Sequence, residues 1–496
     1  MQKFGDFMFI SNLYIGCMIN TIIMVNLVRY NIAKLSGKAT YHLAKRGPGS
    51  GGTYPGHVFT KIGGYDSVSK LASELKTGAV LITGTNGKTT TTTLLIKLMS
   101  NDVDFRYSYE NNILNSIVTS LLTQKGDLGI FEYGIRNLTY GIPDTVERLI
   151  NPIGVVYTTI SQEHAQVAGV KNPFEDYYKA KKLLSQAMTR GAIITNADDP
   201  RTAFIGIEKS KDVNINYYGI EAEGIEDSNA ETIECPKCGE KLIFLKHFLN
   251  HRGYYQCNCG FKRPEPNLKL VNAKFGVNKW ILTIKGEVFN YIASKKIRID
   301  LKLKVPPFGF HNIYNTLASI TAYATFTPKS ERIETTIKKV FNNLDMSFIP
   351  PGRFEVVNIG GKYVGLGQGD NGDALKINAM CMKPYVEGPL EFIYTTPDEK
   401  EDEIFKDHFN VIKSMNPKHI IVVPGRKSTR KAEEYFEIIK KEFDNVDFYP
   451  LSYDKLDERI DKLTELAHES DYKYVIMSGC GEEQAMWEKI KIKLKE

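Results

Sequence analysis

Short apolar runs separated by longer polar or amphipathic stretches recur along most of the chain. Four of them lie in the first half, at residues 78–81, 127–134, 153–160 and 191–200. Strands that are buried on both faces read as continuous apolar runs, so this alternation predicts a parallel sheet covered by helices on both sides. The sequence therefore indicates an α/β fold.

The pattern changes near Gly224 and changes again after residue 350. Residues 272–305 alternate between apolar and polar positions, which is typical of antiparallel strands. A helical stretch from Asn312 to Phe326 follows, and a second α/β unit begins after it. The apolar runs of that unit are residues 390–396, 419–425 and 474–481.

A chain of 496 residues is long enough for about three domains. We expect a short amino-terminal region in residues 1–75, a central domain in 76–345 and a carboxyl-terminal domain in 346–496. The central domain carries an insert at about residues 225–271, where the α/β pattern is interrupted. The amino-terminal region holds a glycine-rich loop from Gly47 to His57, where backbone amides can approach a ligand.

Composition and charge argue against a disordered protein and against a nucleic-acid-binding protein. Hydrophobic residues make up 42% and charged residues 25% of the chain, as in globular and not in disordered proteins. The net charge is only +6, and the 64 basic and 58 acidic residues are well mixed. This argues against a dedicated nucleic-acid surface and is compatible with an anionic small substrate such as a nucleotide.

The amino terminus contains an uncharged segment from Phe7 to Val28, which is long enough to span a bilayer. It also contains three asparagines, which are costly in hydrocarbon, and no small-residue cleavage site follows it, so a removable signal peptide is not expected. Three alternatives stay open: an apolar helix packed on the body, a start site placed too early in the sequence, or membrane association through residues 7–28. We expect a cytoplasmic protein. If the segment inserts, the basic residues that follow from Arg29 onward would keep the catalytic body in the cytoplasm, at the inner face of the membrane.

The turn after the first apolar run has the composition of a phosphate-binding loop. It lies between a predicted strand and a helix that begins near Thr89, which is the arrangement that presents backbone amides to phosphate oxygens. Lys88 would reach the β- and γ-phosphates of ATP, and the Thr89 hydroxyl would bind magnesium. The loop residues are Gly84, Thr85, Asn86, Gly87, Lys88, Thr89 and Thr90.

This loop, TGTNGKTTT, resembles that of the Mur ligase family. The resemblance extends over several motifs from about residue 45 to the end. It implies three domains: a substrate-binding amino-terminal domain, a central P-loop ATPase domain and a carboxyl-terminal dinucleotide-fold domain. It also implies ATP-dependent synthesis of cell-wall peptides on a nucleotide-linked sugar.

Further site residues follow from the resemblance. Glu132, in FEYG, and His164, in SQEHAQ, take the positions of the magnesium-binding residues of the family. The segment DYYKAKKLL resembles the one whose lysine becomes a carbamate, which would hold a second magnesium ion. Matching on the following leucines selects Lys181, with Lys179 and Lys182 as alternatives.

Three more positions are expected near the nucleotide. Asn312 and Asn315, in HNIYN, resemble the family's asparagines beside ATP, and Arg353, in GRFE, resembles its phosphate-contacting arginine at the domain junction. Residues 366–375 resemble a segment of MurE. Asp370 takes the position of a histidine there and is carried over as an ATP-binding residue.

Four of the seven cysteines cluster in the insert, and their spacing is that of a zinc ribbon, not of a disulfide framework. Two knuckles separated by eighteen residues predict a structural zinc ion. The second knuckle is C-x-C in place of the usual C-x-x-C, so His251 is an alternative ligand. The four cysteines are Cys235, Cys238, Cys257 and Cys259.

The insert resembles that of MurT, a Mur-type protein that pairs with the glutaminase GatD to amidate lipid II. The GTYPG and FKRPEPN segments are also similar to MurT, whereas GCGEEQ, at residues 479–484, resembles a late motif of MurE. A MurT-like ribbon with MurE-like chemistry resembles the pseudomurein peptide ligases of methanogens.

Three functions compete. The first is an ATP-dependent ligase that activates a carboxylate as an acyl phosphate and joins an amino acid to a nucleotide-linked precursor of pseudomurein or murein. The second is the synthetase subunit of a glutamine-dependent amidotransferase with a GatD-like partner, whose cysteine–histidine pair Asp370 or Asp373 would complete. The third is a zinc-ribbon binding protein with a vestigial nucleotide fold, against which the intact loop and Glu132 argue.

Overall fold

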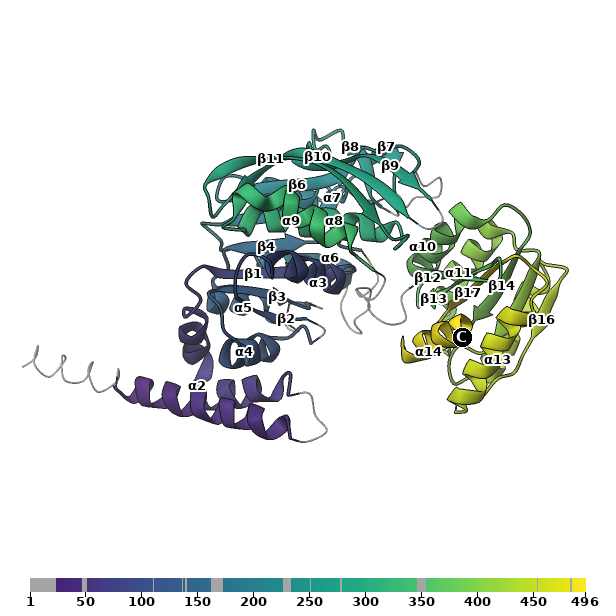
Figure 1. Cartoon of the computed structure of the whole chain (residues 1–496), viewed down its shortest axis with the longest axis horizontal. Helices are drawn as coiled ribbons and strands as arrows, with labels where there is room; N and C mark the ends of the chain where they lie inside the picture. The colour runs from purple at the N-terminus through teal and green to yellow at the C-terminus, as the bar shows by residue number, and fades with distance from the viewer. Residues whose placement is uncertain are drawn as a thin grey trace, which may run out of the picture.

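The described part of the protein contains two α/β units and a pair of amino-terminal helices (Figure 1). The carboxyl-terminal unit lies to one side of the larger central unit. The computed structural model describes residues 24–46, 51–109, 111–135, 137–138, 141–161, 173–225, 233–249, 251–276, 279–345, 354–452, 454–481 and 484–496.

The central unit is built on a nine-stranded sheet with the order β11-β10-β9-β6-β5-β4-β1-β3-β2. The strands from β2 to β9 in this order are parallel, and β10 and β11 continue the sheet as antiparallel strands, as predicted. The strands are β1 Gly78–Thr83, β2 Phe105–Ser108, β3 Leu128–Glu132, β4 Gly154–Tyr157, β5 Ala192–Asn196, β6 Asn214–Ile220, β9 Leu268–Phe275, β10 Trp280–Asn290 and β11 Lys295–Val305.

Helices cover both faces of this sheet, which is why its parallel strands are apolar throughout. In β1, Val80 and Ile82 enter the core formed with α3 and α8, whereas Ala79 and Leu81 enter the core formed with α2, α4 and α5. The predicted helices near Thr89 and from Asn312 are α3 and α8. The helices of this unit are α3 Lys88–Met99, α4 Leu114–Thr123, α5 Pro143–Ile150, α6 Pro173–Leu183, α7 Pro200–Lys209, α8 His311–Phe326, η2 Ser330–Arg332 and α9 Ile333–Asn342.

The carboxyl-terminal unit has a six-stranded sheet with the order β12-β13-β17-β14-β15-β16, in which only the edge strand β12 is antiparallel. The three predicted strands are β14, β15 and β17. The elements are β12 Glu355–Ile359, β13 Lys362–Gln368, α10 Gly372–Met382, η4 Lys383–Tyr385, β14 Leu390–Thr395, α11 Asp402–Met415, β15 His419–Val423, α12 Thr429–Ile439, β16 Val446–Phe448, α13 Leu456–Glu469, β17 Tyr474–Gly479 and α14 Gln484–Lys495.

Between residue 24 and the central sheet, the described residues form two helices: one over residues 24–44 and α2, Tyr54–Ala72. The predicted loop from Gly47 to His57 is wrong for residues 54–57, because α2 begins at Tyr54 with a proline in its first turn. Gly56 lets α2 pack closely on α4, because a Cβ at this position would lie 2.0 Å from the carbonyl oxygen of Asn115 in α4.

The described end of the uncharged segment, residues 24–28, is helical. Among the described residues, no helix is both long enough and apolar enough to cross a bilayer. Most of the uncharged segment, residues 7–23, lies outside the described residues.

The predicted insert forms a small ribbon between β6 and β9. It contains a hairpin of β7, Ile243–His247, and β8, Gly253–Gln256, with the cysteine knuckles on either side. Its apolar residues pack on α7, where Phe204 meets the ring of Phe261 edge-on with centroids 5.5 Å apart. The ribbon is therefore packed against the central unit and does not project from it.

Candidate active site at the phosphate-binding loop

The predicted phosphate loop connects the end of β1 to the first turn of α3. Gly84 has a φ of +150° and Gly87 a φ of +83°, which favour glycine. Gly84 also has no room for a side chain, because a Cβ would lie 2.0 Å from the hydroxyl oxygen of Thr158. The loop therefore presents the amino terminus of α3 without side chains in the way, as an anion site requires.

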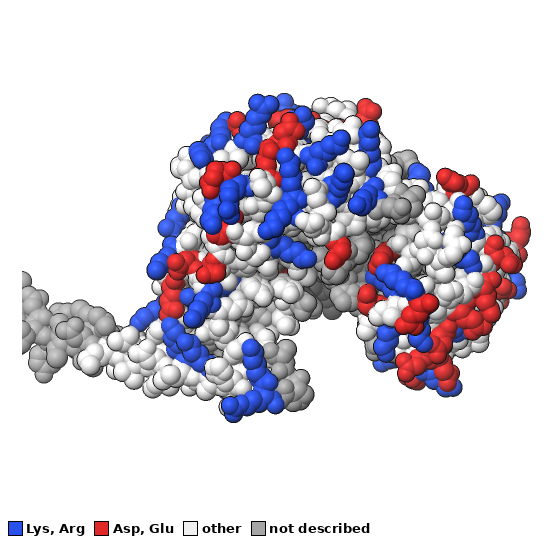
Figure 2. All heavy atoms as spheres, viewed as in Figure 1, with Lys and Arg blue, Asp and Glu red and all other residues white. Residues whose placement is uncertain are grey.

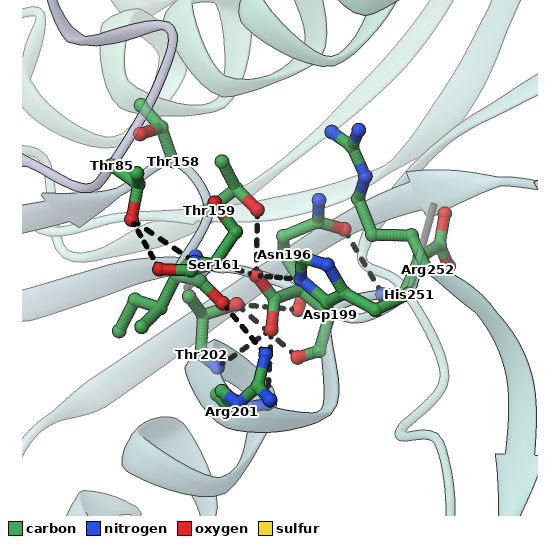
Figure 3. Close-up of polar contacts among 12 residues, drawn as sticks. Thr85, Thr158, Thr159, Ser161, Asn196, Asp199, Arg201, Thr202, His251 and Arg252 are labelled. Carbon is green, nitrogen blue, oxygen red and sulfur yellow. Dashed lines mark hydrogen bonds and ion pairs between the residues drawn. The ribbon is translucent and has the colours of Figure 1, made fainter. Parts of the chain in front are cut away.

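The segment that follows β4 braces this loop. The Thr85 amide donates to the Thr159 carbonyl at 2.6 Å, and the Thr158 hydroxyl donates to the Asn86 carbonyl at 2.6 Å. In return, the Ser161 amide donates to the Thr85 hydroxyl oxygen at 3.0 Å (Figure 3). These contacts fix the loop in the conformation that an incoming phosphate group would meet.

Two basic groups lie at the loop. Lys88 donates from Nζ to the carbonyls of Gly84 and Thr85 at 3.0 and 2.8 Å. Lys181, in α6, is 1% exposed and donates to the Thr83 hydroxyl oxygen and the Gly84 carbonyl at 3.2 and 3.0 Å. Burial, followed by repulsion from Lys88, lowers the pKa of Lys181 well below its ordinary value.

The neighbouring lysines of α6 point elsewhere. Lys179 pairs with Glu175 at 3.5 Å and its side chain is 61% exposed, and Lys182 pairs with Glu208 at 2.6 Å. Among the three lysines that the sequence left open, Lys181 is thus the one that the structure places against the phosphate loop.

Glu132 ends β3 beside the last residues of β1, where it pairs in register with Ile82. Its carboxylate is buried and accepts from Asn112 Nδ2 at 3.4 Å. Attraction to the Glu132 carboxylate partly opposes the fall in the pKa of Lys181. An oxygen ligand at this position suits magnesium.

Of the two predicted asparagines on α8, Asn315 lies against the loop and Asn312 contacts Asn315. Asn315 Nδ2 donates to Asn312 Oδ1 at 2.8 Å, and Thr91 of α3 donates to Asn315 Oδ1 at 3.4 Å. A Cβ on Gly87 would lie 2.2 Å from Asn315 Oδ1, so this side chain lies directly against the loop.

Three predicted residues cannot be compared with the loop, and the contacts of a fourth, Asp370, lie elsewhere. His164 and Arg353 lie outside the described residues, as does the side chain of Asp373. The Asp370 carboxylate accepts from the Gly481 amide at 3.3 Å and lies 3.7 Å from Arg426 Nη2. Both partners belong to the carboxyl-terminal unit, so these contacts give no support to a role for Asp370 in ATP binding.

Sequence reasoning missed Asp199, which is fully buried at the end of β5. Its Oδ2 atom accepts from the Thr159 hydroxyl at 2.9 Å and from the Ile160 amide at 2.8 Å, and Oδ1 caps α7. Burial alone would raise the pKa of Asp199, but His251, Arg201 and the Ile160 amide together hold it well below its ordinary value. The available signal was the Asp-Pro pair, which marks a helix start.

The four ribbon cysteines converge as predicted. Their sulfur atoms all lie within 4.8 Å of one another, and the Cys235–Cys259 and Cys238–Cys257 pairs are 3.8 and 3.5 Å apart. A tetrahedral zinc ion with thiolates at about 2.3 Å requires sulfurs about 3.8 Å apart, so the cluster fits zinc. The alternative ligand His251 is not in this group, because its Nε2 atom lies 3.2 Å from Asp199 Oδ2.

Comparisons with known proteins agree with this geometry. Residues 82–261 match the model of the Mur ligase middle domain. The chain is 28% identical over 300 residues to subunit MurT of the lipid II isoglutaminyl synthase (glutamine-hydrolyzing) of Staphylococcus aureus. That match spans 59% of this chain and 61% of the relative.

Solved structures extend the likeness over most of the chain. A pseudomurein peptide ligase type C from Methanothermus fervidus is similar with a TM-score of 0.62 and 25% identity, over 86% of this chain and 80% of that one. The MurF ligase from Thermotoga maritima in complex with ADP shares the fold, with a TM-score of 0.56, 13% identity and coverage of 87% and 83%.

The loop geometry predicts the effect of removing the Lys88 ammonium group. We expect Lys88→Ala to weaken ATP binding about 10- to 100-fold, because a charge-assisted contact to phosphate is lost, and to abolish phosphate release. Titration with a fluorescent ATP analogue measures this. Lys97→Ala, at an exposed position of the same helix, is the matched control. Equal affinity in both variants would contradict the assignment of the loop.

The cysteine geometry predicts a metal stoichiometry. Elemental analysis should find about one zinc per chain. The Cys235→Ser variant should lose the zinc ion and melt at a lower temperature, because zinc binding no longer stabilises the ribbon. Cys17→Ser, far from the ribbon in the sequence, should keep its zinc. A Cys235→Ser protein with full zinc content and unchanged melting temperature would show that this cysteine is not a ligand.

Proposed function

The chain carries a Mur ligase middle domain in a Mur ligase-like fold, and from this premise we propose that it is an ATP-dependent carbon–nitrogen ligase. A carboxylate oxygen of the acceptor attacks the γ-phosphorus of ATP, which gives an acyl phosphate and ADP. An amine then attacks the carbonyl carbon, loses a proton, and expels inorganic phosphate as the C–O bond breaks. The product is an amide or peptide bond.

The observation that carries this proposal is the convergence of Lys88, Glu132 and Lys181 on one braced loop. Phosphoryl transfer demands positioning and charge neutralisation more than covalent chemistry. Lys88 would neutralise the phosphates, while Thr89 and Glu132, with His164 as the expected third ligand, would hold magnesium. Magnesium would supply the charge that stabilises the transferring phosphoryl group, and Arg353 would contact the same group from the domain junction.

Lys181 has the properties that a carbamate-forming lysine needs. Only a neutral amine attacks carbon dioxide, forming the N–C bond and releasing one proton. The lowered pKa of Lys181 raises the neutral fraction at a given pH. The resulting carbamate would carry a negative charge beside Thr83 and Gly84, where a second magnesium ion could bind.

The substrates that we propose are a nucleotide-linked cell-wall peptide precursor and an amino acid. The likeness to a pseudomurein peptide ligase at 25% identity supports pseudomurein over other polymers. The broader class, precursor synthesis for pseudomurein or murein, is also supported by the middle domain.

The second candidate is the synthetase subunit of a glutamine-dependent amidotransferase. The likeness to the MurT subunit supports it. The nitrogen would then be ammonia from a GatD-like glutaminase, and Asp370 or Asp373 would complete the cysteine–histidine pair of that partner. A buried Lys181 directed at the phosphate loop favours the peptide ligase, because a carbamate on it would hold the second magnesium ion that an amino-acid ligase of this type is expected to use.

We propose that the protein acts in the cytoplasm, with its amino-terminal helix held at the membrane surface. The helix over residues 24–44 exposes large apolar side chains, and Figure 2 shows a largely uncharged stretch along it. Basic residues such as Arg29 and Lys38 lie on the same helix and suit anionic headgroups. The exposed side chains are Met24, Val25, Leu27, Val28, Ile32 and Leu35, each 45 to 71% exposed.

Vesicle flotation tests the membrane proposal. The protein should float with vesicles that contain anionic lipid, and the double substitution Ile32→Glu and Leu35→Glu should reduce the bound fraction, because two exposed apolar contacts become charged. Ile207→Glu and Ile438→Glu, at other exposed positions, are the control. Absence of the wild type from the floating fraction would remove the proposal.

The test of the ligase reaction is centred on Lys181. Phosphate release by the isolated protein is screened over single amino acids, ammonium and glutamine with candidate acceptors. Lys181→Ala should lose nearly all activity, acetate should restore part of it, and bicarbonate should raise the activity of the wild type. Lys179→Ala is the matched control, because that lysine lies on the same helix and is exposed.

Folding of the inactive protein is checked with Lys181→Met. This substitution removes a buried amine, so the melting temperature should stay the same or rise while activity is lost. Activity with ammonium alone, together with full activity of Lys181→Ala, would overturn the peptide-ligase proposal in favour of the amidotransferase.

A further inference from the structure

The ribbon inserts one charged or polar side chain into the central unit at each of two buried carboxylates. His251, at the tip of the hairpin, is 1% exposed and its Nε2 atom lies 3.2 Å from Asp199 Oδ2. Arg263, just past the second knuckle, donates from Nε to Asp198 Oδ1 at 2.7 Å. Both carboxylates are fully buried at the end of β5, so the ribbon supplies a partner for each.

The two carboxylates have different neighbours in the central unit. Asp198 Oδ2 accepts from the Ile220 amide and from the Tyr314 hydroxyl, at 2.8 and 2.9 Å. Asp199 Oδ2 instead accepts from Thr159 and Ile160, which lie in the segment that braces the phosphate loop. Asp198 therefore contacts the sheet and α8, whereas Asp199 contacts the segment next to the proposed nucleotide site.

A continuous path of polar contacts runs from His251 to the phosphate loop (Figure 3). Asp199 holds both the hydroxyl of Thr159 and the amide of Ile160, and Arg201 Nη1 donates to the Ile160 carbonyl at 3.0 Å. Thr159 then accepts from the Thr85 amide through its carbonyl at 2.6 Å. Every group on this path is buried, so water cannot easily replace a missing partner.

We propose that His251 is a positioning residue: the ribbon uses it to hold Asp199, and through Asp199 the 158–161 segment, so that the phosphate loop keeps its nucleotide-binding conformation. The zinc ribbon would thereby act on the nucleotide site and not merely staple the insert. This rests on the proposed nucleotide site, but it does not depend on which amine the enzyme uses.

A buried carboxylate that loses a partner costs free energy, because water cannot replace the lost contact. Without His251, Asp199 keeps Arg201 as its remaining cationic neighbour, and Arg201 also donates to the Ile160 carbonyl. A shift of the Asp199 carboxylate toward Arg201 would move the acceptor away from the Ile160 amide and loosen the brace. Small displacements of a phosphate-binding loop have large effects on affinity.

The experiment compares ADP affinity, steady-state kinetics and hydrogen exchange in the full-length zinc-loaded protein. His251→Ala should raise the ADP dissociation constant about tenfold, raise KM for ATP more than it lowers kcat, and accelerate exchange of the Ile160 amide. Zinc content should stay at about one per chain. His251→Gln should restore much of the affinity, because its side-chain amide can donate to Asp199 from a similar position.

His247→Ala is the matched control, since this histidine lies in the same hairpin and its ring stacks on Phe244 at 4.2 Å. If His251→Ala does not fold, Asp199→Asn is measured in its place. If the oxygen of this asparagine caps α7 as Asp199 Oδ1 does, its NH2 group faces the Ile160 amide. Two donors then meet where Asp199 has an acceptor.

The outcomes separate this inference from the proposed function. A wild type that binds no ADP would refute the nucleotide site itself. Normal ADP binding by the wild type, with unchanged affinity in His251→Ala or Asp199→Asn, would overturn only the positioning role. A loss of kcat at constant KM would also overturn it, since that result indicates a smaller folded fraction and not a displaced loop.

Discussion

The buried carboxylate of Asp199 is the constraint on which the candidate site depends. A charge with no solvent exposure must be matched by donors and cations, and three separate segments supply them. The first turn of α7 takes one oxygen, and the segment after β4 takes the other, with His251 and Arg201 as the neighbouring basic groups. Meeting this one requirement brings the ribbon, β5 and the phosphate loop into a single buried network.

The proposed chemistry lies at the carboxyl ends of β1, β3 and β4, where α/β sheets commonly bind ligands. The phosphate loop follows β1, Glu132 ends β3, and the residues after β4 form hydrogen bonds with the loop. Lys181 reaches the same point from α6, and the helix buries its amine so that the pKa falls. Sheet topology therefore assembles groups that are far apart in the sequence.

Periodicity and turn chemistry predicted β1, β3, β4, β5, β10, β11, β14, β15 and β17, together with α3, α8, the phosphate loop and the cysteine cluster, because each has a local signature. The sheet strands β2, β6, β12, β13 and β16 were not predicted. The helix over 24–44 and the start of α2 were not predicted. The glycine at position 56 suggested a loop, but it reflects contact with Asn115, which only the packing reveals. The choice of Lys181 over its neighbours and the pairing of His251 with Asp199 likewise depend on tertiary contacts between distant segments.

The central claim is that the reaction passes through an acyl phosphate. The most direct test uses an acceptor whose carboxylate oxygens are labelled with oxygen-18, with ATP and the amine that the enzyme accepts. The account predicts that each turnover transfers one labelled oxygen to inorganic phosphate, because the acceptor oxygen becomes the bridge to phosphorus. Amide formation that releases only unlabelled phosphate would contradict the account, since the carboxylate would then have been activated in another way.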